Sequence, residues 1–178
     1  MRKETWKTRD MTFVALMAVL ICVSTWICIP GAVPFTMQTF GVFAAVELLG
    51  GRRGFWAVAV YLLMGAVGLP VFSGMTGGLG ILLGQTGGYL WGFLLIPLLC
   101  RLAEALPCRG SAMRVIAMIL GMILCYGLGT VWYVQVSGAG MAGWTAALSV
   151  CVLPFLIPDA VKLFLALSLG QKLAKHIR

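Results

Sequence analysis

The chain has 178 residues, of which 61% are hydrophobic and 10% are charged, and its mean hydropathy is +1.03. Soluble domains average about 45–50% apolar and about 25% charged residues, so 13 basic and five acidic side chains cannot cover a water-facing surface. The composition excludes a soluble globular protein and a disordered one. The net charge of +8 does not indicate nucleic acid as a partner, because the basic residues form short clusters between apolar runs. We therefore expect an all-α integral membrane protein embedded in the lipid bilayer.

Long apolar runs predict six transmembrane helices in a single membrane domain, residues 1–178. A helix that crosses the hydrocarbon core needs about 20 predominantly apolar residues. The predicted spans are residues 12–29, 36–49, 55–67, 89–106, 113–134 and 158–175. Gly50 and Gly51 are expected to end the second span. Pro158 is expected to start the last one, because proline favours the first turn of a helix, with Trp144–Leu153 as a short helix or loop over the bundle.

The basic residues predict the orientation of these spans. Four lie at the N-terminus, two at Arg52–Arg53, three between Arg101 and Arg114 and three at the C-terminal end. The connections between these clusters carry no charge, and Lys162 is the exception to the alternation. Since lysine and arginine collect in cytoplasmic loops, both termini are predicted to be cytoplasmic. The first apolar run is interpreted as a retained membrane helix and not as a cleaved signal peptide.

Asp159 and Lys162 are charged residues that this arrangement places inside a span, in its outer half. They are three residues apart and therefore share one face of a helix. Ionisable groups in a membrane are costly and usually face a cavity or a partner. Two interpretations stay open: a structural ion pair, or a polar ligand site in which Asp159 accepts from N–H groups and Lys162 donates to a carbonyl or carboxylate.

A glycine-rich segment between residues 68 and 92 is the second unusual feature. Its nine glycines disfavour an ordinary helix, and non-helical backbone at membrane depth is tolerated where it is buried or lines a cavity. One interpretation is a re-entrant outer loop that brings backbone close to a ligand. The other is close helix packing through the pairs Gly84/Gly88 and Gly88/Gly92. Both can hold together.

Other residues add polar or aromatic groups near the same end. Gln38 offers donors and an acceptor in the uncharged connection before the second span, and Tyr89 offers an aromatic wall or an anchor at the membrane interface. The sequence contains no Walker A motif, no nucleophile–base constellation and no metal-ligand cluster. We therefore expect no enzyme activity, no cofactor and no metal.

Three segments in this order resemble a known family. GLPVFSG…GGLG…LLGQTGGYLWGF, together with PFTMQTFGV and PFLIPDAVKLFLA, resembles the BioY biotin-transport proteins. These proteins are the biotin-specific substrate-binding (S) components of energy-coupling factor (ECF) transporters. The resemblance covers essentially the whole chain, and it is the resemblance, not the composition, that selects biotin.

The resemblance implies a multi-pass protein of the bacterial cell membrane that binds biotin with high affinity in an outward-facing pocket. Its implied partners are a transmembrane coupling subunit and two ATP-binding cassette ATPases, which energise uptake as the S component topples in the membrane. The implied substrate-binding residues are Asp159, Lys162, Gln38, Gly87, Gly88 and Tyr89.

Small residues on the first helix suggest where the coupling subunit docks. Ala15, Ala18 and Cys22 form a small-residue face, in which Ala18-x-x-x-Cys22 is the best match to the helix-packing pattern. The alternative for these residues is ordinary packing within the bundle. For the whole chain, the alternative functions are a stand-alone ion-coupled vitamin carrier, with Asp159 titrating, and a non-transporting scaffold or receptor.

Overall fold

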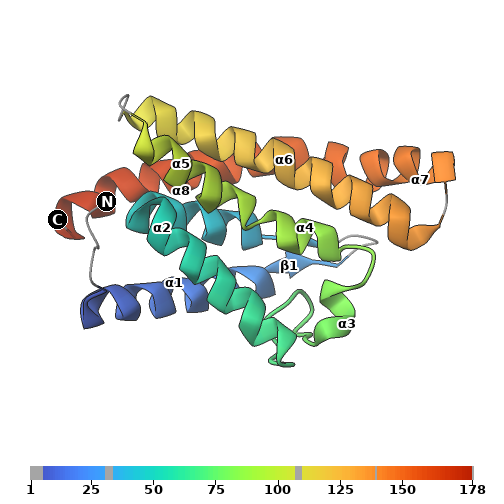
Figure 1. Ribbon diagram of the computed structural model, residues 1–178, viewed down its shortest axis with the longest axis horizontal. Coiled ribbons are helices and arrows are strands. Elements are labelled where there is room, and N and C mark those ends of the chain that lie inside the picture. Colours follow the sequence, from blue (N-terminus) through green and yellow to red (C-terminus); the bar gives the residue numbers. More distant parts are fainter. Residues whose placement is uncertain (1–5, 31–33, 107–109, 139, 178) are drawn as a thin grey trace.

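The computed structural model describes residues 6–30, 34–106, 110–138 and 140–177 (Figure 1). Arg2, Lys3, Arg109 and Arg178 of the predicted charge pattern lie outside the described residues. The helices are α1 (Thr8–Trp26), α2 (Gln38–Ala66), α3 (Leu79–Leu82), α4 (Gly87–Gly92), α5 (Leu95–Ala105), α6 (Ser111–Ser137), α7 (Gly140–Ala146), the π-helix η1 (Ala147–Val152) and α8 (Leu153–Ile177). Strands β1 (Cys28–Ile29) and β2 (Phe35–Thr36) form a small antiparallel pair. The helical class predicted from the sequence is confirmed.

Helix α2 reverses direction at Gly50, as Figure 1 shows. Gly50 has a φ of +81°, a left-handed conformation that glycine adopts without the steric cost of a side chain. An added Cβ at Gly54 would lie 3.1 Å from the Cα of Val46, whereas residues eight apart in a straight helix are about 12 Å apart along the axis. The predicted break at Gly50–Gly51 is therefore confirmed, although the second half resumes directly after Gly50 and not at residue 55.

The last helix differs from the sequence prediction. Pro158 does not start it: α7, η1 and α8 follow one another from Gly140 to Ile177, and Pro158 lies inside α8. The stretch Trp144–Leu153 is thus part of this helical run and no separate element over the bundle. An internal proline removes one backbone hydrogen bond, to the carbonyl four residues earlier. Directly after Pro158, Asp159 is buried and hydrogen-bonded to Thr39 on α2 and Tyr126 on α6, and a local proline rule does not include such tertiary contacts.

Four helical stretches are long and apolar enough to cross a membrane within the part of the chain described. They are Thr8–Trp26, Gly87–Ala105, Ser111–Ser137 and Gly143–Leu173. The two halves of α2 are shorter. Glycines bring the crossing helices close together: an added Cβ at Gly121 would lie 2.6 Å from the Cα of Ile96, and one at Gly92 2.7 Å from Cys125 Sγ. The small-residue packing predicted for this segment is therefore present between α4–α5 and α6.

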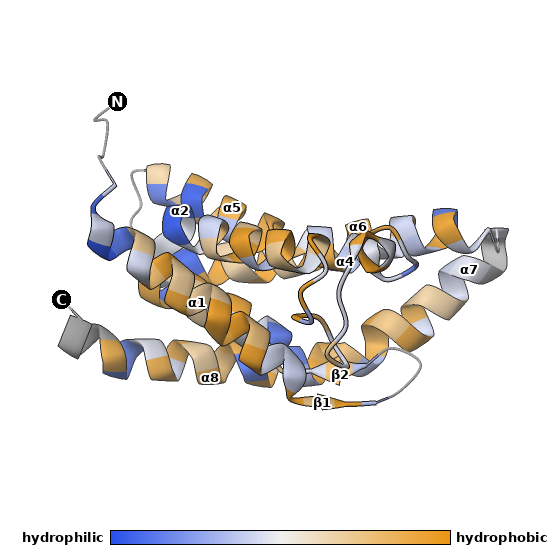
Figure 2. Cartoon of the chain, turned by 90° about the horizontal axis from the view of Figure 1, so that it is seen from below, coloured by the Kyte–Doolittle hydropathy of each residue, from blue (hydrophilic) through white to orange (hydrophobic). Residues whose placement is uncertain are grey.

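Charged contacts gather at one end of the bundle. Arg53 pairs with Asp10 at 3.0 Å, Arg114 pairs with Glu47 at 3.2 Å, and the N–H of Gly51 donates to Glu104 at 2.8 Å. Figure 2 shows hydrophilic residues where α1 begins, where α2 turns and where α8 ends. The strands and the glycine-rich segment lie toward the opposite end (Figures 1 and 2). The bundle is thus polar at one end, as the alternating basic clusters predict.

Candidate functional site

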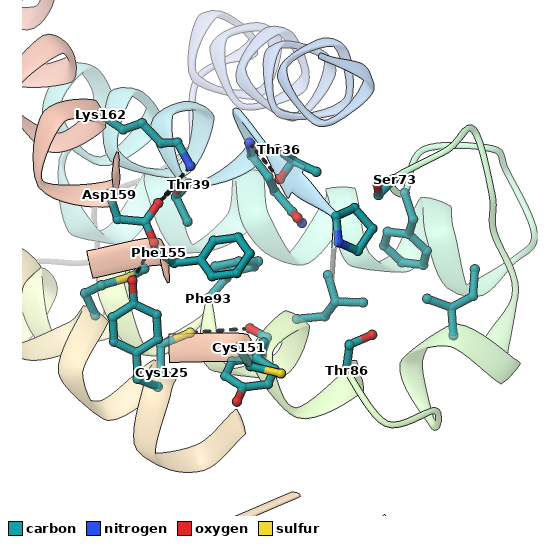
Figure 3. Close-up of a pocket in the computed structure, with 18 of the residues that line it drawn as sticks. Thr36, Thr39, Ser73, Thr86, Phe93, Cys125, Cys151, Phe155, Asp159 and Lys162 are labelled. Carbon is teal, nitrogen blue, oxygen red and sulfur yellow. Dashed lines mark hydrogen bonds and ion pairs between the residues drawn. The ribbon is translucent and has the colours of Figure 1, made fainter. Parts of the chain in front are cut away.

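A cavity of about 320 Å³ lies among the helices (Figure 3). Its lining includes none of the residues that form the ion pairs of the charged end. Its wall combines the β2 strand and the start of α2 with the segment after α2, and with α4, α6, η1 and α8. Most of the lining is apolar or aromatic, including Phe72, Phe93 and Phe155. Cavities of this size with few polar groups are typical small-molecule sites.

Asp159 and Lys162 meet in the wall of this cavity. Lys162 Nζ donates to Asp159 Oδ1 at 2.8 Å, and the two residues are 5% and 3% exposed. Their spacing of three positions places them on one face of α8, as predicted. The ion-pair interpretation is therefore confirmed, and the pair lies at a cavity, whereas its role in ligand binding stays a prediction.

Three further residues hold this pair, and sequence reasoning missed them. The Thr39 hydroxyl donates to Asp159 Oδ1 at 2.7 Å, and the Tyr126 hydroxyl donates to Oδ2 at 2.5 Å. Lys162 Nζ lies 4.2 Å from the centre of the Phe35 ring, a favourable cation–π distance. Thr39 and Phe35 lie in the same short segment as Gln38, and this nearness in the sequence is the only feature that could have indicated their place at the site. Tyr126 is one aromatic residue in an apolar run and gives no signal at all.

Gln38 also lines the cavity, as predicted. Its amide nitrogen donates to the Tyr61 hydroxyl at 2.9 Å, and that hydroxyl lies 3.3 Å from the Thr25 hydroxyl on α1. Both Gln38 and Tyr61 are buried. The contact fixes the amide in one orientation at the cavity and joins the start of α2 to α1.

Some residues of the glycine-rich segment line the cavity, and others pack against neighbouring parts of the chain. Phe72, Ser73 and Thr76 come from its non-helical part and line the cavity, whereas a re-entrant loop that brings backbone close to a ligand stays a prediction. Tyr89 also lines it, with its hydroxyl 3.3 Å from that of Thr130. Gly87 is not in the wall: an added Cβ there would lie 2.0 Å from the carbonyl oxygen of Leu82.

Gly88 behaves in the same way. It is absent from the cavity wall, and an added Cβ would lie 2.3 Å from Trp132 Cβ on α6. The structure thus brings Asp159, Lys162, Gln38 and Tyr89 together around one cavity, and it places Gly87 and Gly88 behind the wall as packing positions.

The docking face predicted on α1 divides between buried and exposed residues. Ala18 is 1% exposed and Cys22 is 5% exposed, so both pack inside the bundle of the single chain, and docking through this face stays a prediction. Ala15 lies on the exposed side of the helix. The small residues serve the close approach of α1 to α2, where an added Cβ at Gly41 would lie 3.0 Å from the Cα of Ile21. The alternative of ordinary bundle packing therefore holds for Ala18 and Cys22.

Comparison with known proteins gives consistent matches over the whole length. A sequence model of the BioY family matches residues 1–178. The chain is 38% identical over 172 residues to the biotin transporter BioY of Thermotoga maritima, covering 94% of this chain and 96% of that protein. It is 34% identical over 168 residues to the probable biotin transporter BioY of Pyrococcus horikoshii, covering 94% and 97% respectively.

A solved structure matches the fold as well. The crystal structure of the S component for biotin from an ECF-type ABC transporter superimposes with a TM-score of 0.80 at 25% sequence identity. The match covers 96% of this chain and 95% of that one. These matches and the apolar helices identify a multi-pass membrane protein with the S-component fold.

Proposed function

Because the chain belongs to the BioY family, we propose that it is the biotin-binding S component of an ECF-type importer. The observation that carries the proposal is the buried Asp159–Lys162 pair in the wall of a largely apolar cavity. Relatives named as biotin transporters and a solved biotin S component support the same ligand.

The chemistry of the cavity suits biotin. The ligand has a ureido ring with two N–H donors and one carbonyl, an apolar thioether ring and a valerate carboxylate. The cavity offers a carboxylate, an ammonium and the amide of Gln38 in a wall of aromatic and aliphatic side chains. A few placed polar groups in an apolar pocket give both orientation and affinity. Asp159, Lys162, Gln38 and Tyr89 are the proposed contacts, while Gly87 and Gly88 act by shaping α4 behind the wall.

The proposed membrane arrangement has six crossings with both termini in the cytoplasm. The two halves of α2, residues 38–49 and 51–66, count as separate crossings because α2 reverses at Gly50. The charged end, with Asp10, Arg53, Glu47 and Arg114, is assigned to the cytoplasm by the positive-inside rule. The cavity then opens toward the outside.

Uptake needs an energy source, and the proposal assigns it to partner subunits. The sequence contains no Walker A motif, and the structural relative comes from an ECF-type ABC transporter. The proposed partners are a transmembrane coupling subunit and two ATP-binding cassette ATPases. The alternative function is a stand-alone ion-coupled carrier that uses the same cavity, and the experiment must distinguish the two functions.

Reconstitution in liposomes tests the proposal. The purified chain alone should bind radiolabelled biotin without accumulating it under any proton or sodium gradient. Addition of the coupling subunit and ATPases should give uptake with ATP and none with ADP, the matched control. Gradient-driven accumulation by the chain alone would establish the carrier instead, and absence of biotin binding would refute the proposed function.

A further inference from the structure

The carboxylate of Asp159 is held from three helices at once. Thr39 reaches it from α2, Tyr126 from α6 and Lys162 from α8, at 2.7, 2.5 and 2.8 Å. Lys162 shares a helix with Asp159 and cannot alone fix the carboxylate relative to the rest of the cavity. The two hydroxyls can, because they belong to two other helices, α2 and α6.

Counting lone pairs shows what this arrangement leaves for a ligand. Each carboxylate oxygen has two acceptor positions. Oδ1 receives the Thr39 hydroxyl and the Lys162 ammonium, whereas Oδ2 receives the Tyr126 hydroxyl. Oδ1 is therefore filled, and one acceptor position remains on Oδ2. A carboxylate held in this way presents one directed acceptor instead of a freely rotating charge.

The hydroxyls themselves have little left to donate. A tyrosine or threonine hydroxyl carries a single proton, and in both residues that proton is directed at Asp159. Both side chains line the cavity, yet neither can donate to a ligand without releasing the carboxylate. Their contribution to ligand binding is thus expected to pass through Asp159.

We propose that Tyr126 and Thr39 are positioning residues that orient the Asp159 carboxylate for ligand binding. The inference rests on the proposed function, since it concerns how the same cavity binds biotin. Two uncharged side chains are thus expected to contribute more to biotin affinity than burial of their apolar surface alone would give.

Removal of each hydroxyl gives the first measurement. Tyr126→Phe and Thr39→Val keep the shape of the side chain and remove its donor. Hydrogen bonds to charged groups are the stronger class, so each change should weaken biotin binding about 10- to 100-fold. Thr39→Ser, which retains a hydroxyl, should recover most of the loss seen with Thr39→Val. Tyr133→Phe is the matched control, because Tyr133 lies on the same helix and outside the cavity wall.

A double-mutant cycle separates positioning from direct contact. In the Asp159→Asn background the charge is gone, and neutral hydrogen bonds are roughly half as strong as charge-assisted ones. Tyr126→Phe should then cost only about 3- to 10-fold in biotin affinity. Thermal unfolding of each purified variant without biotin confirms that it is folded.

Three results would overturn the inference. Equal fold-losses for Tyr126→Phe in both backgrounds would show that the hydroxyl acts independently of Asp159. Equal affinities of folded Tyr126→Phe, Thr39→Val and wild-type protein would show that neither hydroxyl matters; both results would leave the biotin function intact. Absence of biotin binding by the wild-type protein would overturn the proposed function as well as this inference.

Discussion

Lys162 holds its ammonium between the Asp159 carboxylate, 2.8 Å from Oδ1, and the Phe35 ring, whose centre is 4.2 Å away. The side chains of the ion pair are 4% and 6% exposed, so water does not compensate either charge. The carboxylate and ammonium therefore depend on each other, and the aromatic ring from β2 ties the pair to the loop at the cavity. Loss of either charge leaves the other buried without its partner.

Asp159→Asn should lower biotin affinity by two orders of magnitude or more. The change keeps the shape of the side chain and leaves the Lys162 charge unpaired, and breaking a buried pair costs about 3–5 kcal/mol, equivalent to at least about 100-fold in affinity. Equilibrium binding of radiolabelled biotin to purified protein measures the effect. Asp10→Asn is the control, because its partner Arg53 lies at the opposite, charged end. Wild-type affinity of a folded Asp159→Asn variant would show that the pair is not the binding site.

The orientation in the membrane can be tested by thiol labelling. Ser73 lies in the segment after α2 at the cavity, and Ser111 starts α6 at the charged end. In a cysteine-free background, Ser73→Cys should react with an impermeant thiol reagent on intact cells, whereas Ser111→Cys should react only after permeabilisation. Biotin should slow the labelling at position 73. Equal labelling of both positions on intact cells would contradict the six-crossing arrangement.

The sequence was informative where a physical constraint acts locally. Gly50 marks the reversal of α2 because few other residues adopt its φ of +81°, and a buried charge pair stands out in an apolar helix. Tyr126 and Thr39 could not be found in this way, since they act through contacts 33 and 120 positions away in the chain. The error at Pro158 is similar: α8 continues through a residue that local rules treat as a boundary, and the long-range contacts of the neighbouring Asp159 are not visible to such rules.

The ion pair between Arg114 and Glu47 should contribute to stability. It joins α6 to α2 at 3.2 Å, with side chains 32% and 13% exposed, and Gly170 allows α8 to pack against Glu47. Arg114→Met should destabilise the protein by about 1–3 kcal/mol, because a largely buried carboxylate loses its partner. The double variant Arg114→Met/Glu47→Gln should recover part of the lost stability. Thermal unfolding of each variant in detergent measures the effect.

Arg53→Met provides the comparison for that pair. Its side chain is 43% exposed in the contact with Asp10, and exposed ion pairs contribute about 0–1 kcal/mol. If Arg53→Met lowered the stability of the protein as much as Arg114→Met does, burial would not determine how much these ion pairs contribute to stability. Biotin affinity should be unchanged in Arg53→Met, since the residue is remote from the cavity wall.

Gly88 should be intolerant of even one methyl group. An added Cβ would lie 2.3 Å from Trp132 Cβ and 3.2 Å from the Cα of Gly129, so α4 and α6 would have to separate. Overpacking of this kind costs about 1–3 kcal/mol, and it moves α4, which carries Tyr89 into the cavity wall. Gly88→Ala is therefore expected to lower both the thermal unfolding midpoint and the biotin affinity, although Gly88 does not line the cavity.

Gly127→Ala is the matched control, because Gly127 lies on α6 and, apart from its chain neighbours and the adjacent backbone of α6, no described atom lies within 4 Å of an added Cβ. Alanine is favoured over glycine in a helix by about 1 kcal/mol, so this change should leave biotin affinity unchanged and leave the unfolding midpoint the same or higher. If Gly88 acted through direct backbone contact with the ligand, Gly88→Ala would lower affinity without lowering the unfolding midpoint of the ligand-free protein. Loss of both quantities in Gly88→Ala, and of neither in Gly127→Ala, is the result expected from packing behind the cavity wall.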